Sequence, residues 1–170
     1  MRVIETTTLT LEPQVVAHAA AMFVVLSDPA IYEFENAPPA SVEWLQERFR
    51  KLETRQSADS TEQWLNWVIR LPTSALIGYV QATIYPSGVA EIAYVLSSAY
   101  WGRGLARQAV EAMIGELGAY YNVQSLLATL KRTNYRSLRL LERLGFTLAS
   151  PAQHAAHEVE PDEILMQRAV

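Results

Sequence analysis

Apolar residues recur along the middle of this chain at every second position, which is the spacing of a half-buried strand. In residues 63–71, one face of the strand would carry Leu65 and Trp67. Further strands are expected at residues 75–85 and 89–96, after turns that contain Pro, Ser and Gly. Because short turns join neighbouring antiparallel strands, the pattern predicts a three-stranded antiparallel meander.

Elsewhere the apolar residues follow the three-to-four-residue spacing of a helix. Val15, Ala19, Met22 and Leu26 form one such stripe, and Pro13 is expected to open that helix. Helices are expected from Pro13 to the stop at Asp28-Pro29, from the cap at Ser41, and over residues 104–118 and 134–144. Further strands are expected over residues 1–10, 122–130, 146–149 and 162–170. Loops are expected over residues 30–40, 54–61, 97–104 and 150–161.

The order of these elements indicates a fold class. An antiparallel meander beside strand–helix–strand crossovers is typical of an α+β (mixed α/β) fold. The chain has 170 residues and 50% of them are hydrophobic, which is enough for one domain with a core. We therefore expect a single domain over residues 1–170.

Composition excludes several classes of protein. The chain has no cysteine, so disulfides, thiolate zinc sites, iron–sulfur clusters and a cysteine nucleophile are excluded. The net charge is −4, which does not favour nucleic acid as a partner. The apolar run at residues 19–26 is too short to span a bilayer, and no signal-peptide pattern opens the chain. These features favour a cytoplasmic protein that binds neither nucleic acid nor membrane.

A strand, a loop with two glycines and a helix follow one another in residues 91–106. Glycine lets a backbone approach a ligand closely, and the free N–H groups at a helix N-terminus bind phosphate. Arg103 and Arg107 add positive charge beside Gly102 and Gly104. The segment predicts either a pyrophosphate cradle or an ordinary strand-to-helix turn. It matches neither the P-loop pattern nor the dinucleotide fingerprint.

A second informative segment is the helix expected over residues 134–144. Ser137, Leu141 and Leu144 share one face of it, and a hydroxyl on an apolar face needs a polar partner. With Asn134 as the N-cap, Ser137 is either a first-turn capping residue or a residue that faces a ligand.

Together, the order and spacing of the two segments resemble the GNAT superfamily of acetyl-CoA-dependent N-acetyltransferases. That family carries the signature Q/R-x-x-G-x-G/A, followed by an asparagine-containing helix that ends in Gly-Phe. Residues 101–106 fill the signature, with Trp101 where Gln or Arg is usual, and Gly145-Phe146 ends the later helix. The Tyr-Trp-Gly-Arg-Gly version resembles the RimJ/RimL-like branch of ribosomal-protein N-terminal acetyltransferases, and the likeness covers essentially the whole chain.

The resemblance implies a GNAT fold, with a twisted, mostly antiparallel central sheet flanked by helices. It also implies that acetyl-CoA is the cosubstrate and that no metal takes part. The loop backbone would bind the pyrophosphate, the end of the preceding strand would bind the pantetheine arm, and Ser137 would lie near the sulfur. The implied cofactor-binding residues are Tyr94, Val95, Leu96, Gly102, Arg103, Gly104, Leu105, Ala106, Arg107, Asn134 and Ser137.

One departure from the family pattern changes the expected catalytic residue. Many GNAT enzymes place a tyrosine general acid seven residues after the asparagine, and this chain has Leu141 there. The resemblance therefore makes Ser137 the better candidate for donating a hydrogen bond or proton to the departing thiolate. Backbone N–H groups near Val95 or Leu96 would stabilise the oxyanion.

The acceptor side is expected to involve two loops that are far apart in sequence. Glu33 and Glu35 lie on one, and His157 and Glu158 lie on the other. In the resembling fold these loops converge on the acceptor pocket, so Glu35 or Glu158 would attract a protonated amine and take its proton. The alternative interpretation is that these residues are plain solvated surface charge.

The sequence thus predicts an acetyl-CoA-dependent N-acetyltransferase whose bound primary amine attacks the thioester directly. An α-amine is roughly 10% neutral at pH 7 and a lysine amine about 0.04%, so a chain without an obvious base favours a low-pKa amine. The acceptor would be a protein N-terminus or a small-molecule amine, such as an antibiotic or polyamine. A non-catalytic acyl-CoA-binding sensor is the alternative function, and a homodimeric state stays open.

Overall fold

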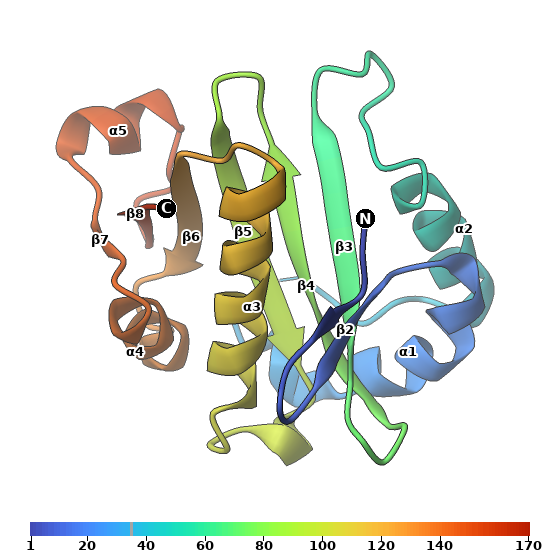
Figure 1. Ribbon diagram of the computed structural model, residues 1–170. Helices are drawn as coiled ribbons and strands as arrows, with labels where there is room; N and C mark the ends of the chain where they lie inside the picture. The colour runs from blue at the N-terminus through green and yellow to red at the C-terminus, as the bar shows by residue number, and fades with distance from the viewer. Residues whose placement is uncertain (35) are drawn as a thin grey trace.

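The computed structural model describes residues 1–34 and 36–170. Its described residues form one eight-stranded sheet in the order β1-β2-β3-β4-β5-β6-β8-β7, with helices on both faces (Figure 1). The strands are β1 (Ile4–Glu5), β2 (Thr10–Pro13), β3 (Gln63–Arg70), β4 (Leu76–Ile84), β5 (Val89–Leu96), β6 (Ser125–Lys131), β7 (Thr147–Leu148) and β8 (Glu163–Ala169). The helices are α1 (Ala19–Leu26), α2 (Val42–Leu52), α3 (Leu105–Tyr120), α4 (Tyr135–Arg143) and α5 (Pro151–Ala156).

The predicted meander is present in the middle of the sheet. Strand β3 pairs antiparallel with β4, and β4 pairs antiparallel with β5. The alternation decides which face each residue takes: Trp67 and Ile69 pack into the core with α3, whereas Val68 packs on the opposite side with α1 and α2. The α+β prediction and the mostly antiparallel sheet are confirmed.

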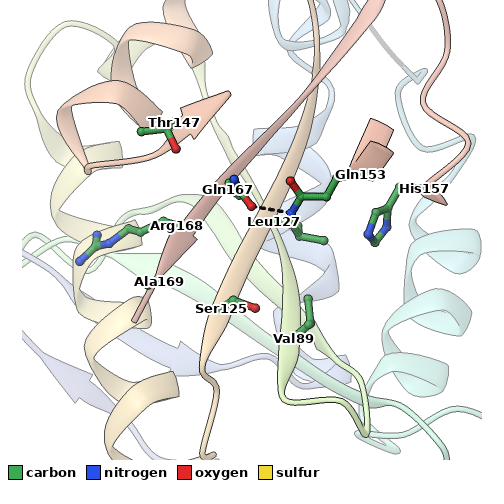
Figure 2. A pocket seen from close by; sticks show the side chains of 9 residues that line it. All are labelled: Val89, Ser125, Leu127, Thr147, Gln153, His157, Gln167, Arg168 and Ala169. Atoms are coloured by element: carbon green, nitrogen blue, oxygen red, sulfur yellow. Dashed lines mark hydrogen bonds between the residues drawn. The ribbon is translucent and has the colours of Figure 1, made fainter. Parts of the chain in front are cut away.

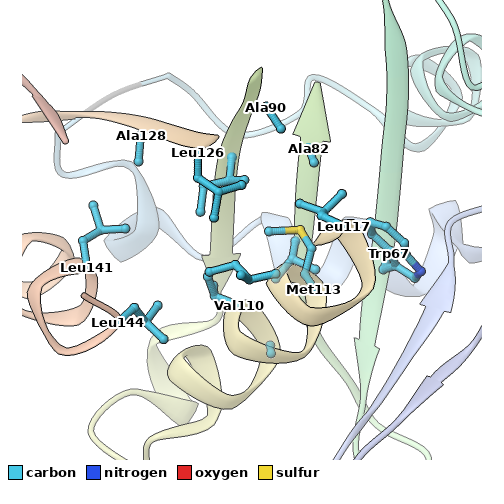
Figure 3. Packing of buried hydrophobic residues seen from close by; sticks show 14 of the residues in the cluster. Trp67, Ala82, Ala90, Val110, Met113, Leu117, Leu126, Ala128, Leu141 and Leu144 are labelled. Atoms are coloured by element: carbon cyan, nitrogen blue, oxygen red, sulfur yellow. The ribbon is translucent and has the colours of Figure 1, made fainter. Parts of the chain in front are cut away.

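The two faces of the sheet have separate apolar cores. On one face, Val110, Met113 and Leu117 of α3 pack against Trp67 and neighbouring strand residues, as Figure 3 shows. On the other face, α1 and α2 enclose a smaller cluster around Met22. Within the part of the chain that the structure describes, no helix has both the length and the apolar character needed to cross a bilayer.

The N-terminal prediction was wrong in its boundaries. Residues 1–10 do not form one strand, and Pro13 does not open a helix, because β2 continues through Pro13, which lies opposite Trp67. Buried Leu9 and Leu11 alternate with the partly exposed Thr10 and Glu12, so the strand pattern extends past residue 10. Proline is tolerated at the end of this strand, where a missing N–H costs little. Helical structure begins only at Val16, with a 3₁₀ turn before α1.

The C-terminal loop prediction was also wrong in part, because residues 150–161 contain α5. Ser150 caps this helix: its hydroxyl accepts from the Gln153 N–H, and the Gln153 side chain accepts from the Ser150 N–H. Pro151 occupies the first helical position, where its fixed φ suits a helix. Helix α5 packs on β8, on the sheet face opposite α3.

One pair of neighbouring strands positions the site. Strands β5 and β6 run parallel, but they pair only from Val89 to Glu91 on β5 and from Ser125 to Leu127 on β6. Beyond Glu91 and Leu127 the two strands diverge, although both continue for several residues. A gap therefore opens in the sheet between the C-terminal halves of β5 and β6.

Gly78 allows the C-terminal end of β5 to stay paired with β4 after β5 has diverged from β6. Gly78 lies opposite Leu96, and a Cβ there would overlap the carbonyl oxygen of Val95. Just beyond, the Ser97 N–H donates to the Ile77 carbonyl at 2.9 Å. This close approach fixes which side of β5 stays open.

Candidate active site

A cavity of about 630 Å³ occupies the gap between β5 and β6. Its walls come from residues 31–34 and 36–39, helix α2, the strands β3 to β6 and helix α4. The diverged part of β5 supplies Tyr94 and Val95, and the first turn of α4 supplies Ser137 with its cap Asn134. Four of the residues that the resemblance assigned to cofactor binding therefore line one cavity.

The glycine loop lies at the end of β5 and leads directly into α3. Gly102 and Gly104 both have φ of +74°, a left-handed conformation that favours glycine, and Gly104 is the N-cap of α3. Both are exposed, and a Cβ at either would meet nothing within 4 Å, so the space in front of the loop is open. Within the part of the chain that the structure describes, no side chain caps α3, and its first-turn N–H groups have no capping acceptor there.

Trp101 ties this loop to β5. Its indole Nε1–H donates to the Leu96 carbonyl at 2.9 Å, and the Arg136 guanidinium stacks over its ring at 3.7 Å from the centroid. The residue at the position usually held by Gln or Arg thus has a structural role here: it joins the loop to the strand and to α4. The sequence shows a tryptophan at position 101, but only the folded structure shows which residues its side chain contacts.

Ser137 and Tyr94 form a hydroxyl pair inside the cavity. The Ser137 Oγ lies 2.6 Å from the Tyr94 Oη. Asn134 is the N-cap of α4, and its Oδ1 accepts from the Ser137 backbone N–H at 3.1 Å. The Asn134 cap is therefore confirmed, whereas the Ser137 hydroxyl is not used for capping and is directed to Tyr94.

Burial keeps Tyr94 protonated. It raises the pKa of Tyr94 to about 12, and the hydrogen bond with Ser137 acts in the opposite direction. At neutral pH the phenol is thus a hydrogen-bond donor. The sequence placed Tyr94 on the strand that lines the cavity but gave no sign of its hydroxyl partner, which comes from a helix 43 residues further along the chain.

The other side of the cavity has a floor of carboxamides. Asn66 of β3 lies opposite Gln81 of β4, which lies opposite Ala93 of β5. Gln14, just beyond β2, donates its N–H to the Asn66 carbonyl at 2.8 Å. All four residues line the cavity. Sequence reasoning missed this row, because it depends on the register of four strands.

The carboxylates expected on the acceptor side do not line this cavity or do not belong to the residues that the structure describes. Glu35 lies outside the described residues. Glu33 is exposed and pairs with Arg136 at 3.5 Å, while neighbouring residues of its loop line the cavity. Glu158 follows α5 with φ of +51° and is not among the lining residues.

His157 lies at a different cavity, of about 390 Å³, between β5, β6, β8 and α5 (Figure 2). There the carboxamide of Gln153 is hydrogen-bonded to Gln167, and His157 lies 3.8 Å from the Glu91 carboxylate. The expected convergence of residues 157–158 with the loop around Glu33 is not found among the described residues. The reason is α5, which carries residues 157–158 along β8.

A family model described as the GNAT acetyltransferase domain matches residues 8–147. The chain belongs to the GNAT acetyltransferase family. It is thus an acetyl-CoA-dependent N-acetyltransferase, and the predictions of family, fold and enzyme class are confirmed.

Three solved structures share the fold of this GNAT protein. RimL, a ribosomal L7/L12 α-N-protein acetyltransferase in complex with coenzyme A, has a TM-score of 0.84 at 17% identity, covering 99% of this chain and 98% of that one. A GNAT-family acetyltransferase from Bordetella pertussis has a TM-score of 0.78 at 24% identity, covering 99% and 100%. The aminoglycoside acetyltransferase AAC(6')-Ib with coenzyme A has a TM-score of 0.74 at 20% identity, covering 95% and 94%.

Proposed function

We propose that this GNAT enzyme binds acetyl-CoA across the glycine loop and the gap between β5 and β6, and transfers the acetyl group to a primary amine. One observation carries the proposal. The diverged half of β5, which includes Tyr94, lines the cavity together with Ser137, and the glycine loop follows directly after the same strand. The open space at Gly102 and Gly104 suits a pyrophosphate, since a side chain there would stand between the ligand and the backbone N–H groups.

The hydroxyl pair supplies the proton at the leaving sulfur. When the amine nitrogen forms its bond to the acetyl carbon, the bond from that carbon to sulfur breaks. The nitrogen releases its extra proton to water, and the thiolate takes a proton or a hydrogen bond. Ser137 can donate it, and Tyr94, which lies 2.6 Å behind, can donate to Ser137. Since the chain has no cysteine, direct transfer from acetyl-CoA to the amine is the simplest route.

The described lining offers donors rather than bases. Burial raises the pKa of Tyr32 and of Tyr94 to about 12, and burial also raises the pKa of Tyr79, so all three stay protonated at neutral pH. Arg48 is the other titratable residue among the described residues of the lining. An amine that is partly neutral in solution needs no strong base, which supports an acceptor of low pKa. Roles for Glu35 and Glu158 as bases stay predictions.

Thiol release in a panel of amines tests the proposal. Wild-type protein should release free CoA from acetyl-CoA at a rate that depends on the amine, and faster at pH 7 with α-amines than with ε-amines of the same size. Acetyl-CoA binding without amine-dependent release in any member of a broad panel would favour the sensor function instead. Absence of acetyl-CoA binding would contradict the assignment of the loop.

Three expectations from the sequence stay predictions: one domain over residues 1–170, a homodimer and a cytoplasmic location. The continuous sheet from β1 to β7 supports the first. A single cooperative unfolding transition would test it, and the mass in solution would test the second.

A further inference from the structure

Gln14 carries a buried hydrogen-bond donor for which the described part of the chain offers no acceptor. The residue is only 3% exposed, yet its side-chain Nε2 has no hydrogen-bond partner among residues 1–34 and 36–170. Buried polar groups in folded proteins are nearly always paired, because an unpaired one has lost its water without compensation. Because Gln14 lines the cavity, a ligand that enters the cavity can supply the acceptor for this unpaired donor.

The backbone fixes the position of this donor. The Gln14 N–H donates to the Asn66 carbonyl at 2.8 Å, and Arg55 Nη2 donates to the Gln14 carbonyl at 2.8 Å. Pro13 precedes it at the end of β2 and restricts the chain further. The backbone of Gln14 is thus held on both sides, and its side chain is buried at the wall of the cavity.

The carboxamide row leads from Gln14 to the reacting centre. Because side chains alternate along a strand, the register places Asn66, Gln81 and Ala93 on one face in consecutive strands. Tyr94 follows Ala93 and takes the opposite face of the sheet, where its hydroxyl meets Ser137, but both residues line the cavity that lies beside the diverged half of β5. An acceptor whose amine reaches this pair through the gap can extend over Gln81 and Asn66 toward Gln14.

The floor favours oxygen atoms over cations. The side chains that Gln14, β3 to β5 and α2 contribute to the lining include amides, aromatics and Arg48, and none is a carboxylate. All of these residues are described. A second ammonium group on the acceptor would meet donors and a guanidinium there, and a charge buried without a partner is costly.

We propose that the Gln14 carboxamide donates a hydrogen bond to a carbonyl or carboxylate oxygen of the acceptor. Gln14 is then a specificity-determining residue, and the acceptor class is a monoamine that carries such an oxygen, rather than a polyamine or another polycation. This inference rests on the proposed function and names the acceptor of the same site.

The Gln14→Met variant removes the donor with little change in volume. The probes are leucinamide, free leucine, 3-methylbutylamine, which lacks the oxygen, and 1,4-diaminobutane. Their amines differ in pKa, so the quantity that counts is the change in selectivity between variant and wild type. The ratio of kcat/KM for leucinamide or leucine to that for 3-methylbutylamine should fall about tenfold, the value of one hydrogen bond. The leucinamide and leucine arms distinguish a carbonyl from a carboxylate.

The Gln63→Met variant is the matched control, because Gln63 is exposed at the start of β3 and does not line the cavity. If Gln14→Met does not fold, Gln14→Glu tests the same point: it keeps the shape, loses the donor, and should shift selectivity toward 1,4-diaminobutane.

A selectivity ratio unchanged in the folded Gln14 variant, with wild-type CoA affinity, would overturn the inference while leaving the proposed function intact. Preference of the wild type for 1,4-diaminobutane over both oxygen-bearing probes would also overturn it. Turnover of no amine at all would contradict the proposed function, and the inference would fall with it.

Discussion

The two ends of the cavity are built in different ways. The end proposed to bind acetyl-CoA comes from two short stretches of chain: Tyr94 and Val95, with the glycine loop that follows them, and Asn134 with Ser137. The chemistry of both stretches is visible in their local order. The end proposed to hold the acceptor comes from Gln14, Arg48, Asn66 and Gln81, which lie on four separate segments. A motif can specify the first end, whereas only sheet register specifies the second. The contrast explains how one family can share a cosubstrate and differ in acceptors.

The largest expected effect lies at the acetyl-CoA end. Gly104→Glu would place a carboxylate at the N-cap of α3, where the pyrophosphate is proposed to bind, and would also strain a residue with φ of +74°. The affinity for CoA, measured by calorimetry, should fall by about 100-fold or more.

Gly145→Glu is the matched control for this prediction. Gly145 also has positive φ, is exposed, and has no atom within 4 Å of a built Cβ, but it follows the far end of α4. The control should carry a similar strain and keep CoA affinity. An equal loss in both variants would mean that strain, rather than the site, explains the effect.

The hydroxyl pair is the next test, because it lies where the two ends meet. Ser137→Ala should lower kcat about 100-fold with little change in CoA affinity, since one proton donor is lost. Tyr94→Phe should also lower kcat, and the double variant should lose less than the product of the two single losses, because the hydroxyls act in series. Steady-state kinetics with a fixed amine measure all three.

Tyr135→Phe is the control for the tyrosine. Tyr135 begins the same helix as Ser137 but is 63% exposed. Wild-type turnover in Ser137→Ala would show that the thiolate leaves unassisted, and independent effects in the double variant would separate Tyr94 from Ser137.

A smaller effect is expected where Arg136 connects the two ends. Its guanidinium stacks on Trp101 of the glycine loop and pairs with Glu33 of the acceptor-side loop. Arg136→Met should weaken CoA binding by about threefold to tenfold, in line with the value of a cation–π contact. Glu33→Gln should change it much less, because an exposed ion pair is worth little. Arg139→Met on the same helix serves as the control, and equal effects in Arg136 and Arg139 variants would contradict the connecting role.

The smallest predicted effect depends on pH. Asp28, after α1, accepts from the Ser98 N–H at 2.7 Å, and hydrogen bonding from Ser98 holds the pKa of the Asp28 carboxyl below its usual value of 3.8. A lowered pKa in the folded state means that the carboxylate stabilises the fold above pH 3.8 and that this contribution disappears as pH falls through the lowered pKa. The difference in unfolding free energy between wild type and Asp28→Asn should thus be larger at pH 7 than at pH 3. Urea titrations at the two pH values measure it, and an equal difference at both would contradict the assignment.

Much of the fold was predictable because its signals are local. The alternation in β3, the glycines before α3 and the Asn134 cap of α4 each depend on neighbouring residues. Helix α5 had a signal too: Ser150-Pro151 with Gln153 three residues after the serine is a capping box with proline at the first position. The alternation of Leu9 and Leu11 could likewise have placed β2.

The parts of the site that the sequence did not predict depend on contacts between segments that are far apart in the chain. That Tyr94 meets Ser137, or that Gln14 lies beside Asn66, depends on which strands pair and in which register. A shift of one residue would turn Asn66 and Gln81 to the opposite face of the sheet. The placement of His157 away from the larger cavity also follows from α5, an element that the sequence interpretation did not include.

A structure of the protein with bound CoA is the most direct test of the central claim. The account predicts the pyrophosphate against the N–H groups of residues 104–107, the pantetheine arm between the diverged halves of β5 and β6, and the sulfur beside the Ser137 hydroxyl. CoA bound instead at the cavity lined by His157 and Gln167, or with its sulfur remote from Ser137, would contradict it.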